Sequence, residues 1–424
     1  MSTLCHFSAD QLLSTIAQLA RFSDTPLHEG VTRFAYSEND ELAHRYIIDL
    51  ATQQGLDCRQ DAVGNVFITL KGQDSSLPAI ATGSHLDTVP NGGQYDGILG
   101  VVAGLYALCQ FKPKTLKRDL TLIIFRCEES SRFGLSCVGS KILTGHTDPE
   151  KWHTITDSSG KTLYQVIDEA GYQSQQLTHC VLPQNAFAAF VELHIEQGRC
   201  LENANVQIGV VNGIAAPTRF QVDVYGQADH SGATPMDQRQ DALVTAAHLI
   251  TTINQLANQE AHLGTVGTVG KLNVYPNAMN VIPGHVRFYV DIRGIDEASI
   301  ARVAQGLTQT VNDLDQAAAI RISLSQLAQE KPVRLNQTVC HIISKLCDKH
   351  TITYQPMLSG AGHDAMYMAT RLPTAMIFIP SKAGISHHKE EYSSSEQILV
   401  GADLLTQTLA ELANFKENVL DDSN

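Results

Sequence analysis

Three short apolar segments in the first half of this chain run directly into clusters of histidine and acidic residues. They are PAIATGSHLD (78–87), LTLIIFRCEES (120–130) and VELHIEQG (191–198). Apolar runs of this length are typical of buried strands. Open α/β sheets bind their ligands at the carboxyl ends of the strands. The pattern therefore predicts an α/β sheet with a functional site where these strands end.

Helical patterns separate the predicted strands. Residues 37–56 form an amphipathic pattern, and residues 98–111 are apolar almost all round, which predicts a buried helix. Strand, helix and strand in succession is the order of an α/β sheet. Helical and buried-strand patterns return at residues 334–350 and 373–380. We therefore expect a mixed sheet flanked by helices, built from residues 1–212 and 330–424.

The pattern changes between residues 213 and 329. Strands and helices there are predicted in the order strand 218–227, helix 237–259, two or more strands within 265–294, helix 296–315 and strand 320–327. This order matches a ferredoxin-like split βαβ unit. Residues 213–329 are therefore expected to form an α+β domain of their own, inserted into the first.

The amino-acid composition excludes some classes of binding partner. The chain has 424 residues, with 30 Lys and Arg against 44 Asp and Glu, a formal charge of −14. An acidic chain argues against a nucleic-acid or an anionic-membrane partner. The N-terminus shows no secretory signal, and no apolar run is long enough to cross a bilayer. With nine scattered cysteines and no CxxC pair, a cytoplasmic protein with reduced thiols is expected.

The polar clusters have the composition of a metal centre. Two divalent ions bridged by a carboxylate need about five or six His and Asp/Glu ligands from separate loops. The candidates are His85, Asp87, Asp96, Glu128, Glu129, His194, Glu196, His387 and His388. Any one of them alone is better explained as a surface or hydrogen-bonded residue. Four such clusters on one α/β scaffold are hard to attribute to chance.

These clusters belong to a longer series of motifs. The series is GSHLDTVPNGGQYDGILGV, CEESSRFG, VELHIEQG, GQADHSGATPM, NVIPG, DIRG, SGAGHDA and GISHHKEEY. It resembles the signature of the allantoate amidohydrolase/N-carbamoyl-L-amino-acid hydrolase family, which belongs to a wider group of dinuclear-metal aminoacylases and carboxypeptidases. The motifs follow the family's order and span residues 83–392, most of the chain.

The resemblance implies a centre with two divalent ions per subunit. His85 and His194 resemble the ligands of one ion, Glu129 and His387 those of the other, and Asp96 the carboxylate that bridges them. Histidine and carboxylate ligands without thiolate suit zinc or manganese, with cobalt and nickel as further candidates. His387 directly follows GIS, where the family has its ligand. The neighbouring His388 is expected outside the ligand set, and His363 is a candidate pocket residue.

The resemblance also implies catalytic roles for two acids. Glu128 resembles the general base, which takes a proton from water and delivers it to the leaving amine. Asp87 resembles the carboxylate that orients a ligand imidazole. In an extended chain consecutive side chains point in opposite directions. Glu129 can therefore bind metal while Glu128 faces the water.

Further residues resemble the family's substrate contacts. They are Gln197, His230, Asn280, Arg293 and Gly362. The resemblance implies that His230 donates to the oxyanion from a second subunit, and that Asn280 and Arg293 hold a substrate carboxylate. Without the resemblance, His230 and Arg293 would be better explained as salt-linked residues at strand ends. The inserted domain is accordingly expected to serve as a lid and to pair two copies into a homodimer.

The expected reaction is hydrolysis of a C–N bond in a small ureido or amide substrate that bears a carboxylate. Allantoate and N-carbamoyl-L-amino acids are the leading candidates, and ureidoglycolate and β-ureidopropionate fit the same residues. Two alternatives stay open. One is an aminoacylase or dipeptidase of the wider group, against which HIEQG argues. The other is a metal-binding protein without activity, which would be expected to lose a ligand or the base.

Overall fold

The computed structural model describes residues 7–317 and 320–415 and divides them into two compact units. Unit 1 comprises residues up to Asn212 together with Leu335–Met357 and the chain from His363 onwards. Unit 2 comprises Gly213–Arg334 and the short segment Leu358–Gly362. The predicted inserted domain, 213–329, did not include that short segment.

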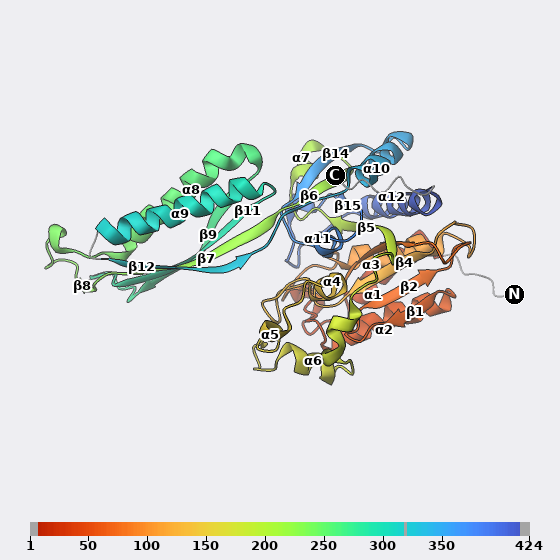
Figure 1. Cartoon of the computed structure of the whole chain (residues 1–424), viewed down its shortest axis with the longest axis horizontal. Coiled ribbons are helices and arrows are strands. Elements are labelled where there is room, and N and C mark those ends of the chain that lie inside the picture. Colours follow the sequence, from red (N-terminus) through yellow and green to blue (C-terminus); the bar gives the residue numbers. More distant parts are fainter. Residues whose placement is uncertain (1–6, 318–319, 416–424) are drawn as a thin grey trace. The chain divides into compact units, whose positions relative to one another are not determined.

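Unit 1 is built around a mixed sheet in which neighbouring strands follow the order β1-β2-β4-β3-β5-β15-β6, with β14 paired to β6 (Figure 1). The strands are β1 Asp57–Gln60, β2 Val66–Leu70, β3 Ala79–His85, β4 Leu120–Phe125, β5 Phe187–Ile195, β6 Ile208–Ile214, β14 Tyr354–Ser359 and β15 Thr374–Ile379. The four central strands, β4, β3, β5 and β15, are parallel to one another. Their carboxyl ends therefore lie along one edge of the sheet.

The helices of unit 1 are α1 Ala9–Leu19, α2 Glu38–Gln53, α3 Ile98–Cys109, α4 Val138–Thr144, α5 Pro149–Trp152, α6 Leu163–Glu169, α7 Cys200–Ala204, α10 Gln337–Lys349, α11 Asp364–Met368 and α12 Ser395–Asn414. Of these, α2, α3, α4, α10, α11 and α12 pack against the sheet. The predicted apolar helix is α3, which packs against α12 and against β3, β4 and β5. Every residue of β4 and β15 is buried, as expected for parallel strands covered on both faces. The predicted mixed sheet flanked by helices is confirmed.

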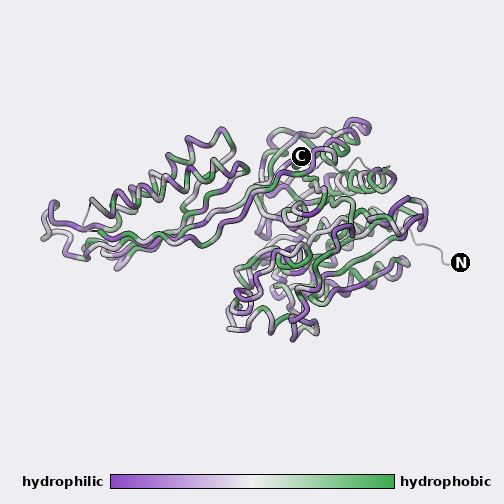
Figure 2. Tube along the Cα trace, viewed as in Figure 1, coloured by the Kyte–Doolittle hydropathy of each residue, from purple (hydrophilic) through white to green (hydrophobic). Residues whose placement is uncertain are grey.

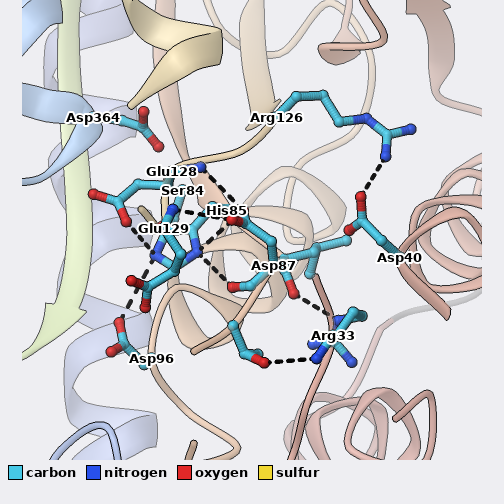
Figure 3. A network of polar contacts seen from close by, with 12 residues as sticks. Arg33, Asp40, Ser84, His85, Asp87, Asp96, Arg126, Glu128, Glu129 and Asp364 are labelled. Atoms are coloured by element: carbon cyan, nitrogen blue, oxygen red, sulfur yellow. Dashed lines mark hydrogen bonds and ion pairs between the residues drawn. The ribbon is translucent and has the colours of Figure 1, made fainter. Parts of the chain in front are cut away.

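A buried ion pair fixes the loop that follows β4. Arg126 is fully buried, and its Nη1 lies 2.7 Å from Asp40 Oδ2 of α2 (Figure 3). Its Nε donates to the carbonyl of Gly64. Burial alone would raise the pKa of Asp40, but His44 and Arg126 outweigh it and hold that pKa well below its ordinary value. The pair therefore links α2 to the segment that carries Glu128.

Unit 2 has the predicted strand–helix–strand–strand–helix–strand order. Its elements are β7 Ala216–Tyr225, α8 Ala242–Glu260, β9 Val266–Tyr275, β11 His285–Gly294, α9 Glu297–Ala317 and β12 Arg321–Gln329. The antiparallel sheet has the order β12-β7-β11-β9. Helix α8 begins later than predicted, because the Asp241 side chain caps it by accepting from the backbone of Leu243 and Val244. Hydrophobic and hydrophilic residues alternate along both helices (Figure 2), whose apolar faces pack on the sheet.

A second, two-stranded sheet of unit 2 pairs β8 (Asp229–His230) with β10 (Val281–Ile282). Ser231 also donates its backbone N–H to the carbonyl of Asn280 at 3.1 Å. The segments that carry His230 and Asn280 are therefore hydrogen-bonded to each other. Across residues 7–317 and 320–415, no helix combines the length and apolarity needed to span a bilayer.

Candidate metal centre

The candidate ligands of unit 1 lie where its parallel strands end. His85 is the last residue of β3, and His194 is the penultimate residue of β5. Glu128 and Glu129 follow β4, which ends at Phe125. Because these strands are neighbours in the sheet, residues far apart in sequence meet at one edge. Figure 3 shows His85 in contact with Asp87, Asp96 and Glu128.

Two groups of potential ligand atoms share Asp96. One group is His85, Asp96 and His194, the other is Asp96, Glu129 and His387, and within each group the ligand atoms lie within 4.8 Å of one another. On one side, Asp96 Oδ1 lies 3.0 Å from His194 Nε2 and 3.8 Å from His85 Nε2. On the other side, Asp96 Oδ2 lies 3.1 Å from His387 Nε2. The two oxygens of one carboxylate thus face two different ligand groups.

Hydrogen bonds orient two of the imidazoles. Nδ1 of His85 lies 2.9 Å from the carbonyl of Asp87, and Nδ1 of His194 lies 2.9 Å from the carbonyl of Ile195. A carbonyl only accepts, so each Nδ1 carries a proton, and in the neutral ring Nε2 keeps its lone pair. Burial alone would lower the pKa of His194, but the Asp96 carboxylate outweighs it and raises that pKa to about 9, so a cation would take the place of a proton on its Nε2. Burial lowers the pKa of His85 to about 4, which keeps that ring neutral. Both Nε2 atoms are therefore oriented as ligands for a cation.

Asp87 acts differently from its predicted role. Its carboxylate lies 3.7 Å from His85 Nδ1, while its main-chain carbonyl makes the hydrogen bond to the ring. The carboxylate instead accepts the backbone N–H groups of Glu128 at 3.1 Å and Glu129 at 2.9 Å. Those two amides occupy its oxygens. Asp87 therefore holds the two glutamates directly and orients His85 through its backbone.

Two backbone positions in the ligand loops require unusual geometry. Gly97, next to Asp96, has φ +72°, and a Cβ there would fall on the His85 ring. His387 has φ 55°, in the left-handed region that non-glycine residues rarely adopt. Its side chain is 50% exposed, whereas His85 and His194 are buried. The neighbouring His388 is exposed, accepts the backbone N–H of Glu390 at Nδ1 and belongs to none of the ligand groups found among the described residues.

The general-base candidate, Glu128, is buried beside the ligands. Its Oε2 lies 3.8 Å from His85 Nε2. Its Oε1 accepts a hydrogen bond from the Cys137 thiol at 3.2 Å. Burial raises the pKa of Glu128 well above its ordinary value, and the Glu129 carboxylate raises it further. A carboxyl group with a raised pKa holds a proton more readily than an exposed glutamate, which suits a group that accepts and releases protons.

Other carboxyl groups surround the same centre. Burial raises the pKa of Glu129 to about 8, and the nearby Asp96 carboxylate adds to that effect. Burial alone would raise the pKa of Asp96, but His194 and His387 outweigh it and keep that pKa well below its ordinary range. Buried carboxylates are costly unless they are paired or coordinate metals. The donor set, three histidines and two carboxylates with a shared Asp96, therefore fits two divalent ions.

Sequence reasoning missed or left open several residues of this region. His363 is buried with its ring centroid 4.5 Å from that of His194, and the two form a further candidate group with Glu192. Both Glu192 oxygens accept hydrogen bonds, from Ser84 and from the Ala365 backbone, which favours a structural role. Cys137 and Glu391 were not singled out at all, although Glu391 lies within the quoted GISHHKEEY motif.

Of the predicted substrate contacts, only Gln197 belongs to unit 1. Its Nε2 donates to Asp96 Oδ2 at 2.9 Å, beside the centre. The others belong to unit 2. There His230 and Asn280 lie in paired segments, and Arg293 donates from Nη1 to the carbonyl of Gly360, two residues before Gly362. Unit 2 thus gathers these residues into two groups, at β8–β10 and around Arg293.

The sequence pattern described as Peptidase family M20/M25/M40 matches residues 81–411. A ureidoglycolate hydrolase of Arabidopsis thaliana is 37% identical over 418 residues, covering 96% of this chain and 87% of that protein. An allantoate amidohydrolase of Bacillus subtilis is 34% identical over 386 residues, covering 91% of this chain and 93% of that protein.

Among solved structures, an amidase of the hydantoinase/carbamoylase family from Burkholderia multivorans superimposes with a TM-score of 0.88. It is 31% identical and covers 96% of this chain and 98% of its own. The family match spans most of the chain, and the predicted resemblance is confirmed. The chain therefore belongs to Peptidase family M20/M25/M40 and is one of its metal-dependent amidohydrolases.

Proposed function

We propose that this enzyme hydrolyses the ureido C–N bond of a small carboxylate-bearing compound, with allantoate and N-carbamoyl-L-amino acids as the leading candidates. One observation carries the proposal: the two oxygens of Asp96 face two separate groups of ligand atoms, with Glu128 beside them. The named relatives act on ureidoglycolate and allantoate, which supports a ureido substrate.

The residues of the centre would divide the work as follows. His85, His194, Asp96, Glu129 and His387 would hold two divalent ions. Such ions, when bound, supply a water of lowered pKa and polarise a carbonyl oxygen. Zinc or manganese fits the donor set best, with cobalt and nickel as further candidates.

Glu128 would move the proton. Its Oε1 is held by Cys137, so Oε2 is the atom that receives the proton from water and returns it to the leaving nitrogen. Burial keeps its pKa raised, which favours this two-way transfer. The Asp87 carboxylate would keep Glu128 in place by accepting a hydrogen bond from the backbone N–H of Glu128.

Arg293 would bind the substrate carboxylate. Its Nε and Nη2 both lie 3.1 Å from the Asp291 carboxylate, and Nη1 donates to Gly360. These bonds orient the guanidinium, which can then grip a carboxylate through its remaining N–H groups. Asn280 is proposed as a further carboxylate contact, and Gln197 and the backbone of Gly362 as contacts to the rest of the substrate.

His230 would stabilise the oxyanion. Its Nδ1 accepts the backbone N–H groups of Gly232 at 3.0 Å and Ala233 at 3.1 Å. In the neutral ring the proton therefore lies on Nε2, which makes Nε2 the donor. A preformed donor of this kind is what an oxyanion needs.

We further propose a homodimer that pairs through unit 2, with the enzyme in the cytoplasm and unit 2 acting as a lid. Strand β9 is an edge of the four-stranded sheet and exposes Val266, Leu272 and Tyr275. An exposed apolar edge strand is a ready site for pairing with another chain. In the dimer, His230 would serve the partner's centre.

The test is ammonia release by metal-reconstituted enzyme from a substrate panel. The panel holds allantoate, ureidoglycolate, β-ureidopropionate, N-carbamoyl-L-amino acids and N-acetyl amino acids, for which product amine is followed. Glu128→Gln is the control, because it keeps the size of the side chain and removes the base. Turnover of a ureido compound that this variant abolishes supports the proposal. Turnover of the N-acetyl compounds alone would move the enzyme to the aminoacylases, and a silent panel would refute the ureido substrate.

A further inference from the structure

Glu391 is buried beside the candidate metal centre but is not a member of either ligand group. It is 4% exposed, and it lies between the loop that carries Asp96 and the turn that carries His387. Its Oε1 accepts the backbone N–H of Tyr95 at 2.9 Å and that of Asp96 at 3.1 Å. The first of these bonds joins residues 296 positions apart in the sequence.

The other oxygen of Glu391 is tied to the second loop. Its Oε2 accepts a hydrogen bond from the Ser386 hydroxyl at 3.0 Å, and Ser386 directly precedes His387. The same hydroxyl lies 3.3 Å from Asp96 Oδ2. Both carboxylate oxygens are thus engaged by groups of the protein, which leaves Glu391 unsuited to bind an ion itself.

The backbone of the Asp96 loop is shaped to receive this side chain. A Cβ at Gly93 would fall on the Glu391 carboxylate. The glycine therefore lets the loop approach closely enough for both amides to donate. Two backbone N–H groups that donate to one carboxylate oxygen attach the loop to this side chain in a defined geometry.

We propose that Glu391 is a positioning residue that holds the bridging Asp96 and the exposed His387 in place for the ions. This inference rests on the proposed dinuclear centre. His387 is half-exposed, and its ring contacts only the carboxylates of the candidate centre among the ion pairs of the described residues, so its position depends on the turn that carries it. Asp96 must present its two oxygens in two directions, which requires a fixed backbone as well as a fixed side chain. Glu391 fastens both segments at once.

The test is titration of the metal-free full-length protein with Zn²⁺ and, separately, Mn²⁺, following the metal dissociation constants. The variants are Glu391→Ala, Glu391→Gln and the matched control Glu390→Ala, whose exposed side chain is the sequence neighbour. Groups that support metal ligands typically cost about 10- to 100-fold in affinity when removed. We expect Glu391→Ala to weaken binding by about that factor. The amide oxygen of Gln can still accept both N–H groups, so Glu391→Gln should recover most of the affinity.

A thermal unfolding scan of each metal-free variant separates positioning from stability. If Glu391→Ala lowers the unfolding temperature but binds both metals as the wild type does, Glu391 only stabilises the fold and the proposal is overturned. Equal losses in the Ala and Gln variants, or a loss in Glu390→Ala, would overturn it too. A wrong substrate assignment would give a different result. The wild type would bind metal and Glu391→Ala would bind it more weakly, but the wild type would turn over no compound of the panel.

Discussion

The thiol of Cys137 donates a hydrogen bond to the carboxylate of Glu128, with Sγ 3.2 Å from Oε1. Both side chains are buried, and the backbone N–H of Cys137 also donates to the Glu128 carbonyl at 2.7 Å. A thiol is a weak donor, so it can hold one oxygen of the Glu128 carboxylate without greatly reducing the basicity of that group. Cys137 therefore selects Oε2 as the oxygen that faces the centre.

We predict that Cys137→Ala lowers kcat about three- to tenfold, the equivalent of one hydrogen bond, and leaves KM unchanged. Cys137→Ser, which keeps a donor, should restore most of the rate. Steady-state kinetics on the best substrate of the panel measure both parameters. Cys340→Ala is the matched control, since it also removes a buried thiol of unit 1. A Ser variant as slow as the Ala variant would show that the thiol does not act as a donor.

Gly97→Ala is predicted to disable the centre. The substitution places a side chain at φ 72° and ψ −46°, a sparsely populated conformation that costs about 1–3 kcal/mol, and drives a methyl group into the His85 ring. Gly160→Ala is the control, because Gly160 also has positive φ, +84°, but its added Cβ would meet no atom within 4 Å. Metal content by mass spectrometry should fall in the first variant only. Chemical denaturation should show a loss of stability in both variants, and a larger loss in Gly97→Ala because of its clash with the His85 ring. Full metal content in Gly97→Ala would contradict the prediction.

Asp40→Asn is predicted to destabilise the protein by roughly 3 kcal/mol at pH 7, because it breaks a buried pair with Arg126. The folded state lowers the pKa of Asp40. Its contribution to stability is therefore complete above the pKa of an unfolded Asp, about 3.9, and is lost as the pH falls through the lower folded pKa. The difference in unfolding free energy between wild type and variant should shrink below about pH 4.

Urea denaturation of the metal-free proteins at several pH values measures that difference. Glu41→Gln is the comparison, since Glu41 also pairs with Arg126 but is partly exposed. Its effect should be smaller. A difference for Asp40→Asn that stays constant down to pH 2 would contradict the assignment.

His230→Ala is predicted to reduce kcat by about two orders of magnitude or more, as loss of an oxyanion donor does, without changing metal content. Because Nδ1 of His230 accepts two backbone hydrogen bonds, the Gln and Asn variants can test which ring nitrogen is the donor. The amide nitrogen of Gln can reach the place of Nε2, whereas that of Asn corresponds to Nδ1. His230→Gln should therefore retain more activity than His230→Asn. The reverse order would show that Nδ1 is the donor.

Much of this architecture could be predicted because the candidate ligands lie at the ends of strands that the local sequence pattern already reveals. His85, Glu129 and His194 each end an apolar run, so the strand pattern already placed them at one edge of the sheet. The βαββαβ order of unit 2 could also be predicted, because apolar and polar residues alternate along its strands and its helices are amphipathic. Those features depend on residues close together in sequence.

The parts that could not be predicted depend on contacts between distant loops. Nothing in the sequence joins Glu391 to Tyr95, since that bond exists only once two loops meet. The pattern also could not tell that the carbonyl of Asp87, instead of its carboxylate, would orient His85. The short segment Leu358–Gly362 has no period of its own, and only tertiary contacts assign it to unit 2.

The position of β15 in the sheet has a consequence for folding during synthesis on the ribosome. This strand lies between β5 and β6, yet its residues, Thr374–Ile379, leave the ribosome long after both. Until then β5, which carries His194, has β3 but not β15 as a parallel neighbour. His387 and Glu391 follow later still. A nascent chain therefore carries four of the five candidate ligands early, but the centre can be completed only after β15, His387 and Glu391 have been synthesised.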